Sequence, residues 1–301
     1  MNLADAVLKL KNSTSILDVF GSSTNMHDIS NYKAIYKELA LILHPDRNPG
    51  FSDEMSKLNK FKSEIEDGVS FKDEASTITY FPDRVEIVFQ NAKIANIWYQ
   101  NLKLLQTPSL VGIASFSRYM PGTDAVLSDN KITYSLYKRA IPLSMLKIPI
   151  DLKHCRWIVS RLFEYAAFLD SNGIVHVGIN PDSVLVIPEN HGVIINSFYH
   201  VNFKGAKLKT VSGKWQHFYP SSLFVDKIAN NNIDIELIKR TAIYMLGDSS
   251  GVGTKLIKVL PEEMLTFFKT SHLNEDSFNV MDKYRAIVKK HFDSKFHELN
   301  V

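Results

Sequence analysis

The sequence predicts an α+β protein of about two domains, and three observations support this prediction. The chain has 301 residues, which is long enough for two hydrophobic cores of ordinary size. Apolar residues recur at helical spacing from residue 32 to residue 65 and again from 151 to 172. Between residues 174 and 195, short β-branched runs alternate with turn residues, which is typical of short strands. We therefore expect a small helical part followed by a larger mixed part.

Composition and charge exclude several classes of protein. An apolar fraction of 45% is that of a globular chain, and a net charge of +3 implies no bulk polyelectrolyte role. Cys155 is the single cysteine, which excludes an intrachain disulfide and fits a reducing compartment. Residues 1–10 lack the pattern of a signal peptide, and no stretch reaches the roughly 20 apolar residues that cross a bilayer. We therefore expect a cytoplasmic protein with no membrane partner.

The segment from residue 32 to residue 66 predicts two antiparallel helices joined by a short loop. Pro45 excludes helix at His44, and the Asn-Pro-Gly that follows is loop chemistry. Gly68 marks the end of the second helix. We therefore expect His44, Pro45 and Asp46 at the exposed tip of a helical hairpin. The apolar stripes comprise Tyr32, Ile35, Tyr36, Leu39 and Leu43 in the first helix, and Met55, Leu58, Phe61 and Ile65 in the second.

This hairpin resembles a J domain, the module by which co-chaperones stimulate the ATPase of DnaK-type chaperones. The likeness runs from about residue 13 to residue 71, and we place the domain at 1–72. Residues 17–21 are similar to the opening helix of that family, and His-Pro-Asp-Arg-Asn-Pro-Gly matches its signature loop nearly letter for letter. In the family, this loop and the basic face of the second helix contact the chaperone, and the aspartate is indispensable. The resemblance therefore implies chaperone-binding roles for His44, Pro45, Asp46, Lys33 and Lys37.

Two positions depart from the family pattern. Glu38 and Ile42 stand where lysine or arginine is usual, so the basic face is thin. We therefore expect weaker electrostatic steering toward an acidic partner. An ordinary turn between two helices is the alternative interpretation of the tripeptide.

The second informative region begins with a helical pattern over residues 151–172. Asn172 and Gly173 supply a left-handed stop, and His176 then opens a loop. Two short strands, near 184–186 and 193–195, enclose a turn. This order of elements resembles the catalytic segment of a protein kinase.

The kinase-like resemblance covers about residues 75–290. It implies a bilobal domain with a reduced amino-terminal lobe at 76–145 and a carboxyl-terminal lobe at 146–301. It also implies that Asp234, at the start of a central buried helix, hydrogen-bonds the backbone of the catalytic loop. The full prediction is an α+β chain with a small all-α J domain followed by a bilobal protein-kinase-like domain. Such a combination resembles proteins of bacteriophages and some bacteria.

The residues that phosphoryl transfer requires are replaced. Transfer needs a base, metal ligands and cations on the phosphates. In the kinase frame, Gly178 replaces the catalytic aspartate and Ser183 replaces the metal-binding asparagine. Ser197 replaces the metal-binding aspartate or, if the register shifts by one, Asn196 does, and neither is a carboxylate. The glycine-rich loop and the phosphate lysine of strand 85–89 are also missing. We therefore predict a pseudokinase with no enzyme activity, no metal and no cofactor.

Two residues of this loop keep alternative interpretations. His176 survives from the kinase pattern, and we interpret it as a structural histidine of the loop. Asp182, Asp170 and Glu189 are the candidate replacements for the base, and Asp182 lies only four residues beyond Gly178. We interpret Asp182 instead as part of a turn that caps local backbone groups.

A basic stretch occupies the position of the kinase activation segment. Eleven residues without an acid contain Lys204, Lys207, Lys209 and Lys214. Such a stretch is able to bind an acidic protein client or, with its flanking aromatic residues, single-stranded nucleic acid. The simpler interpretation is a solvated loop. Residues 249–255 superficially suggest a phosphate loop, but they lack its spacing and follow a helix.

These observations lead to three functional hypotheses. The first is a non-catalytic co-chaperone-like adaptor that engages a DnaK-type chaperone and holds an unidentified protein client on its pseudokinase domain. The second is a decoy or inhibitor that sequesters a host factor through the same pseudokinase surface. The third is a residual enzyme with atypical nucleotide chemistry.

Overall fold

The computed structural model describes residues 1–13, 16–21, 31–81, 83–135, 140–188, 191–273, 275–293, 295 and 299. The fold combines helices with antiparallel sheets, which confirms the predicted α+β class. The chain divides into two compact units. The first unit comprises Met1–Lys72, Ser76–Val88 and Thr133–Arg139, and the second comprises Asp73–Ala75, Phe89–Ile132 and Ala140–Val301.

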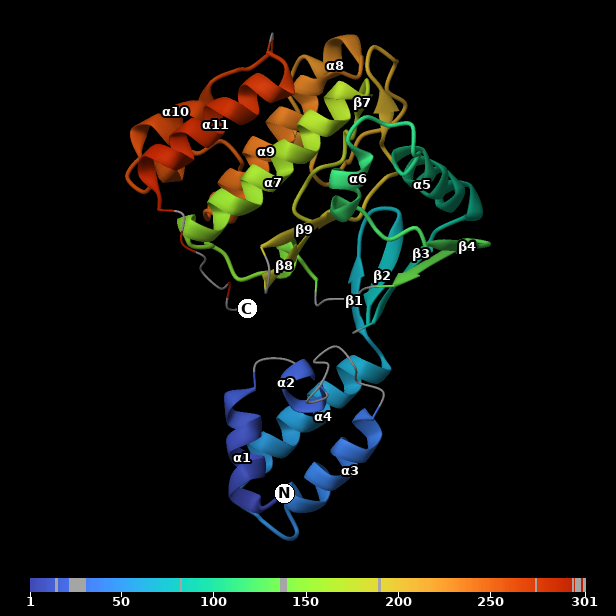
Figure 1. The fold of residues 1–301 in the computed structure, drawn as a ribbon, viewed down its shortest axis with the longest axis vertical. Coiled ribbons are helices and arrows are strands. Elements are labelled where there is room, and N and C mark those ends of the chain that lie inside the picture. The colour runs from blue at the N-terminus through green and yellow to red at the C-terminus, as the bar shows by residue number, and fades with distance from the viewer. Residues whose placement is uncertain are drawn as a thin grey trace. The chain divides into compact units, whose positions relative to one another are not determined.

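A helical bundle forms the core of the first unit (Figure 1, blue). The predicted stripes of the hairpin are confirmed, because Leu39, Leu43, Leu58 and Phe61 are buried there and the remaining stripe residues pack against them. The hairpin is therefore held by burial of one apolar face from each helix. The bundle consists of α1 (Leu3–Asn12), α2 (Ile16–Phe20), α3 (Tyr32–Leu43) and α4 (Ser52–Glu66).

Helix α1 was not predicted. Its first turn is capped by Asn2, whose side-chain oxygen accepts a hydrogen bond from Asp5 N at 2.8 Å. Ala6 and Leu10 are fully buried in the bundle core. These small and apolar residues pack one face of α1 onto the predicted hairpin.

Gly68 ends α4 as predicted. Its φ is +70°, in the left-handed region that favours glycine. A Cβ at this position would lie 2.5 Å from Thr79 Cγ2, so a side chain does not fit without a shift. The turn leads directly into strand β1 (Val69–Lys72).

The first strands form a sheet in the order β1-β2-β3-β5-β4. Strands β1 and β2 pair antiparallel, with Val69 opposite Tyr80 and Lys72 opposite Thr77. Strand β2 buries alternate residues, as expected for a sheet with one covered face. The remaining bounds are β2 (Ser76–Tyr80), β3 (Arg84–Phe89), β4 (Val126–Ser128) and β5 (Lys131–Ser135).

The predicted amino-terminal lobe, residues 76–145, is distributed over both units. Residues 76–88 group with the helical bundle, whereas α5 (Ala92–Leu105) belongs to the second unit. Helix α5 buries Trp98, whose ring lies 5.0 Å from that of Phe198.

The second unit is organised around helix α7 (Leu152–Ser171), which packs against both α9 and α11 (Figure 1). Phe163 of α7 is buried, with its ring 5.3 Å from that of Tyr284 on α11. Strands β8 and β9 form an antiparallel hairpin, with Val184 opposite Ile195, and β6 pairs with β8. The other elements are α6 (Ile113–Phe116), β6 (Ile141–Pro142), β7 (Ile174–Val175), β8 (Val184–Ile187), β9 (Gly192–Ile195), β10 (Asn202–Phe203), α8 (Leu223–Asp226), α9 (Asn231–Met245), α10 (Glu262–Lys269) and α11 (Ser277–His291).

In the described part of the chain, no helix combines the length and the apolar composition that crossing a bilayer requires.

Candidate functional site

Two regions carry the predicted site residues, and the first is the turn after α3. The amides of Arg47 and Asn48 both donate to the carbonyl oxygen of His44 at 2.9 Å. The Asn48 side chain also donates to the carbonyl of Ile42 at 2.7 Å, which satisfies one of the open carbonyls at the end of the helix. The turn is therefore held by its own backbone and by Asn48.

The turn exposes the imidazole and the carboxylate of the tripeptide. The side chain of His44 is 49% exposed and that of Asp46 is 86% exposed. The Asp46 amide donates to His44 Nδ1 at 3.3 Å, and one carboxylate oxygen of Asp46 lies 3.5 Å from the same nitrogen. A contact this exposed contributes little to stability, so the Asp46 carboxylate remains accessible to a partner.

The predicted lysines lie on one exposed face of α3. Lys33 and Lys37 are four residues apart, and Leu41 continues the row with 55% of its surface exposed. Glu38, the acid that thins this face, pairs with the amino-terminal ammonium of Met1 at 3.0 Å. We call Lys33, Lys37 and Leu41 the α3 face. The sequence prediction missed Leu41, although its spacing of four residues from Lys37 was the signal for it.

The second region is the loop of residues 176–183, which we call the His176 loop. Asp234, buried on α9, accepts hydrogen bonds from the amides of His176 at 2.7 Å and Val177 at 2.8 Å. This is the contact that the resemblance implied for Asp234. Burial raises the pKa of the Asp234 carboxyl to about 7, against the lowering effect of the two amide hydrogen bonds.

Val177 adopts a backbone conformation that is unfavourable for a β-branched residue. Its φ is +65°, and such a residue in the left-handed region costs about 1–2 kcal/mol. Its amide is held by Asp234, and its carbonyl accepts a hydrogen bond from the Tyr219 hydroxyl at 2.7 Å. The surroundings therefore fix this peptide on both sides, as expected for a strained position that the fold maintains.

Asn180 organises the rest of the loop. Its side-chain oxygen accepts from the amides of Asp182 at 3.0 Å and Ser183 at 3.1 Å, and its side-chain nitrogen donates to the Gly178 carbonyl at 3.1 Å. The predicted turn at Asp182 is confirmed. The capping role given to Asp182 was wrong, because Asn180 performs it.

Gly178, the position of the predicted missing base, has two histidine rings at ordinary contact distance. A Cβ there would lie 3.4 Å from His200 Cδ2 and 3.5 Å from His176 Nδ1. His176 is fully buried, and its Nδ1 accepts the Gly178 amide at 3.2 Å. Burial lowers the pKa of His176 to about 3, and the neighbouring His200 adds to this effect, so the His176 ring is neutral near pH 7.

Ser183 and Ser197, which we interpreted from the sequence as replacements for the metal ligands of a kinase, lie in different surroundings. The buried hydroxyl of Ser183 donates to the Asn180 carbonyl at 3.1 Å and accepts the Asn180 amide at 2.9 Å. Ser197 is partly exposed and precedes Phe198, whose ring lies 5.7 Å from that of His176. The Ser183 hydroxyl is therefore engaged within the loop.

Asp182 points out of the loop toward the chain after residue 211. One of its oxygens accepts from Lys214 Nζ at 2.6 Å and from the indole of Trp215 at 2.8 Å. The carboxylate is buried, so the lysine charge compensates its own. This arrangement gives Asp182 a structural role at the base of the basic stretch.

The four lysines of the basic stretch do not form one free patch. Lys204 pairs with Asp170 at 2.6 Å, and Lys214 pairs with Asp182 at the same distance. Lys207 and Lys209 are exposed. Acids from α7 and the His176 loop therefore neutralise half of the positive charge that the sequence places in this stretch.

Glu74 is a site residue that the sequence prediction missed. Its carboxylate accepts from the Ser212 hydroxyl at 2.9 Å, from the Gly213 amide at 3.0 Å and from the Lys214 amide. Ser212 and Glu74 are 138 residues apart in the chain, so no local pattern signals the contact. The amides of this turn are thereby occupied by an internal carboxylate.

The loop at 249–255 has a structural explanation. Asp248 accepts from the amides of Ser250 at 3.1 Å, Gly253 at 3.0 Å and Lys255 at 3.3 Å. The carboxylate therefore takes the amides that a phosphate would need, in agreement with the prediction that this segment is no phosphate loop.

Across the described residues, no three His, Cys, Asp or Glu side chains gather into a group able to hold a metal ion. Neither protein-family models nor curated protein sequences show a match to this chain.

Proposed function

We propose that this protein is a non-catalytic co-chaperone-like adaptor. Residues 1–72 of its first unit act as a J domain that engages a DnaK-type chaperone ATPase through His44, Pro45, Asp46, Lys33 and Lys37. Its second unit is a pseudokinase that binds a protein client.

The exposed tip of the α3–α4 hairpin carries this proposal. A carboxylate that is 86% exposed stands next to a half-exposed imidazole, on a turn that Asn48 ties to the helix end. Two lysines follow the same helix on an exposed face. A surface of this kind offers charge and hydrogen-bonding groups to a partner at no cost to the fold.

The His176 loop supports a non-catalytic second unit. Gly178 has no side chain and therefore supplies no proton acceptor. Asp234 is buried and accepts two backbone amides. Asp182 is buried and accepts hydrogen bonds from Lys214 and Trp215. General base catalysis needs a group within hydrogen-bond reach of its substrate, which these buried acids do not offer.

Steady-state ATP turnover by a purified DnaK-type chaperone tests the proposal. We expect the full chain to accelerate turnover, and we expect Asp46→Asn to return the rate to that of the chaperone alone. Asp53→Asn is the matched control, because it removes the same charge from an exposed position on α4 and should keep the stimulation. Equal turnover with and without the wild-type protein would remove the idea.

The α3 face provides a second arm of the same assay. Lys33→Gln combined with Lys37→Gln should raise the protein concentration needed for half-maximal stimulation, most strongly at low salt, because surface charges mainly accelerate encounter. Lys60→Gln on α4 is the control. A cellular activity that survives Asp46→Asn and is lost without the second unit would favour a decoy or inhibitor instead.

A further inference from the structure

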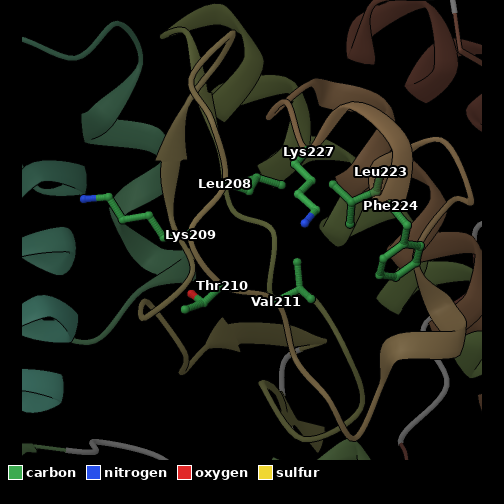
Figure 2. A pocket seen from close by; sticks show the side chains of 7 residues that line it. All are labelled: Leu208, Lys209, Thr210, Val211, Leu223, Phe224 and Lys227. Atoms are coloured by element: carbon green, nitrogen blue, oxygen red, sulfur yellow. The ribbon is translucent and has the colours of Figure 1, made fainter.

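A cavity of about 230 Å³ lies between the extended segment 208–211 and helix α8 in the second unit (Figure 2). Leu208 and Leu223 are buried in its wall, whereas Phe224 is 41% exposed and stands nearer to solvent. Val211 completes the apolar lining. An apolar cavity of roughly 150 Å³ holds a benzene ring, so this one has room for a large aliphatic or aromatic side chain.

Positive charge accompanies the apolar wall. Figure 2 shows the Lys227 side chain reaching in among the lining residues, whereas Lys209 reaches away from them. Neither lysine forms an ion pair with a described residue. An acidic group beside a bound apolar side chain would therefore gain a cationic partner at Lys227.

The backbone holds Lys227 in a conformation that glycine normally occupies. Its φ is +55°, and its amide donates to the Leu223 carbonyl at 3.0 Å, which closes the short helix α8. A residue with a side chain costs about 1–2 kcal/mol in this region. A lysine is present where glycine would be more stable, and such strain is a reason to look for a function of the ammonium group.

The segment beside the cavity also presents backbone amides without a hydrogen-bond acceptor among the described residues, although the His200 ring engages the backbone of Thr210. The Leu208 amide donates to the Lys227 carbonyl at 2.8 Å, and the Ser212 amide donates to the Tyr219 hydroxyl at 3.0 Å, so both ends are anchored. Between these anchors, the amides of residues 209–211 make no hydrogen bond to another described group. An extended peptide can add to such an edge as an extra strand.

We infer that this cavity is a docking site for an extended acidic peptide that carries one large apolar side chain. The apolar side chain fills the space beside Leu208 and Leu223, and an adjacent carboxylate pairs with Lys227. The peptide backbone pairs with residues 209–211. This inference rests on the proposed function, because it specifies the kind of client segment that the second unit binds.

A protein segment fits these observations better than a nucleic acid does. Single-stranded nucleic acids need several free cations along a groove and aromatic rings on which bases stack. Lys204 and Lys214 are engaged by acids, and Phe224 is the aromatic residue of the lining. The apolar cavity instead suits one apolar side chain of a peptide, and the ammonium of Lys227 suits one neighbouring carboxylate.

A display library of random peptides, selected on the immobilised full chain without any chaperone, tests the site. We expect enrichment of sequences in which leucine, methionine or phenylalanine stands directly beside aspartate or glutamate. Fluorescence anisotropy with a labelled enriched peptide then measures affinity. Phe224→Asp and Lys227→Gly should each weaken binding about tenfold or more, because one places an acid at the apolar wall and the other removes the cation.

Two features of the variants separate binding from folding. Lys227→Gly relieves the left-handed strain, so its melting temperature should equal or exceed that of the wild type while its affinity falls. Val225→Asp is the control for Phe224→Asp, because Val225 is the next residue on α8, is 87% exposed and lies outside the lining. Lys258→Gln is the charge control. Both controls should bind the peptide as the wild type does.

The inference is wrong if selection enriches no such pattern, or if the enriched peptides bind the Phe224→Asp chain as tightly as the wild type. Binding of a labelled oligouridine that the same variants abolish would assign the cavity to nucleic acid and would also overturn it. No chaperone is present in this assay. If the protein binds the peptide here but fails to stimulate the chaperone in the separate ATPase assay, the chaperone role is removed and the docking site remains.

Discussion

His44 and Asp46 on the first unit, and His176 and Asp234 on the second, are the same residue types in opposite surroundings. The first two side chains are 49% and 86% exposed, whereas the other two are buried. Asp234 uses both carboxylate oxygens to accept backbone amides, and the His176 ring accepts a third amide. The Asp46 carboxylate has an exposed contact with His44 at 3.5 Å.

The difference in burial decides whether each side chain serves stability or binding. A buried group whose hydrogen bonds are made within the fold contributes to stability, and its removal leaves orphaned partners. An exposed group contributes little to stability, so its removal changes binding rather than folding. The predictions below test this contrast, beginning with the largest expected effect.

Replacing Asp234 should be the most damaging change. Asp234→Ala leaves the buried amides of His176 and Val177 without acceptors, at about 1–3 kcal/mol for each, so we expect a loss of about 2–6 kcal/mol in the free energy of unfolding. Asp46→Ala, the matched exposed change, should stay within about 0.5 kcal/mol of the wild type. Urea denaturation of both variants measures the difference. Similar losses for the two would abolish the contrast.

The second prediction concerns the pH dependence of stability. His176 has a folded-state pKa of about 3, below its unfolded value of 6.5, so the unfolded chain binds the extra proton and stability falls as pH drops below 6.5. His176→Asn keeps an acceptor for the Gly178 amide and cannot titrate. Between pH 4 and 6, the unfolding free energy of the variant should therefore fall less steeply, by about 1.4 kcal/mol per pH unit.

Asp234 acts in the opposite direction over the same window. Its raised pKa of about 7 means that its contribution is full below pH 3.8 and declines as pH rises. It is present in both the wild type and the His176→Asn variant, so it cancels in their difference. If the unfolding free energies of the two proteins change with pH at the same rate, the pKa of His176 is the same in the folded and unfolded states, and the prediction is wrong.

The smallest expected effect is that of nucleotide on the second unit. Because Gly178, Ser183 and Ser197 carry no carboxylate and the Asp182 carboxylate is already paired with Lys214, we expect no change in melting temperature with millimolar ATP and Mg²⁺ or Mn²⁺. A folded site filled at a hundred times its Kd would add about 2.7 kcal/mol to the apparent stability, which a thermal-shift assay detects. A reproducible upward shift would mean that the loop binds nucleotide by other groups.

Local patterns were sufficient where neighbours in sequence are neighbours in space. The stripes of α3 and α4, the turn between them and the stop at Gly68 follow from spacing and backbone sterics over a few residues. Helix α1 was missed, although Asn2 at its start and the buried Ala6 and Leu10 on one face fit the same rules.

Contacts between distant segments were not predictable in the same way. The sequence showed four lysines without an acid among them, but Asp170 and Asp182 reach Lys204 and Lys214 from other elements. A charge count along the chain cannot include partners that the fold brings in, because pairing depends on distance in space.

The sequence by itself determined the helical hairpin with its tripeptide tip and the absence of a carboxylate at Gly178, Ser183 and Ser197, because both depend on residue identity and short-range spacing. Only the tertiary structure decided that Glu74 occupies the amides after Ser212, that Asp182 pairs with Lys214, and that Lys227 points into an apolar cavity. These features arise where segments far apart in the chain pack together, and packing selects among side-chain directions that sequence leaves open.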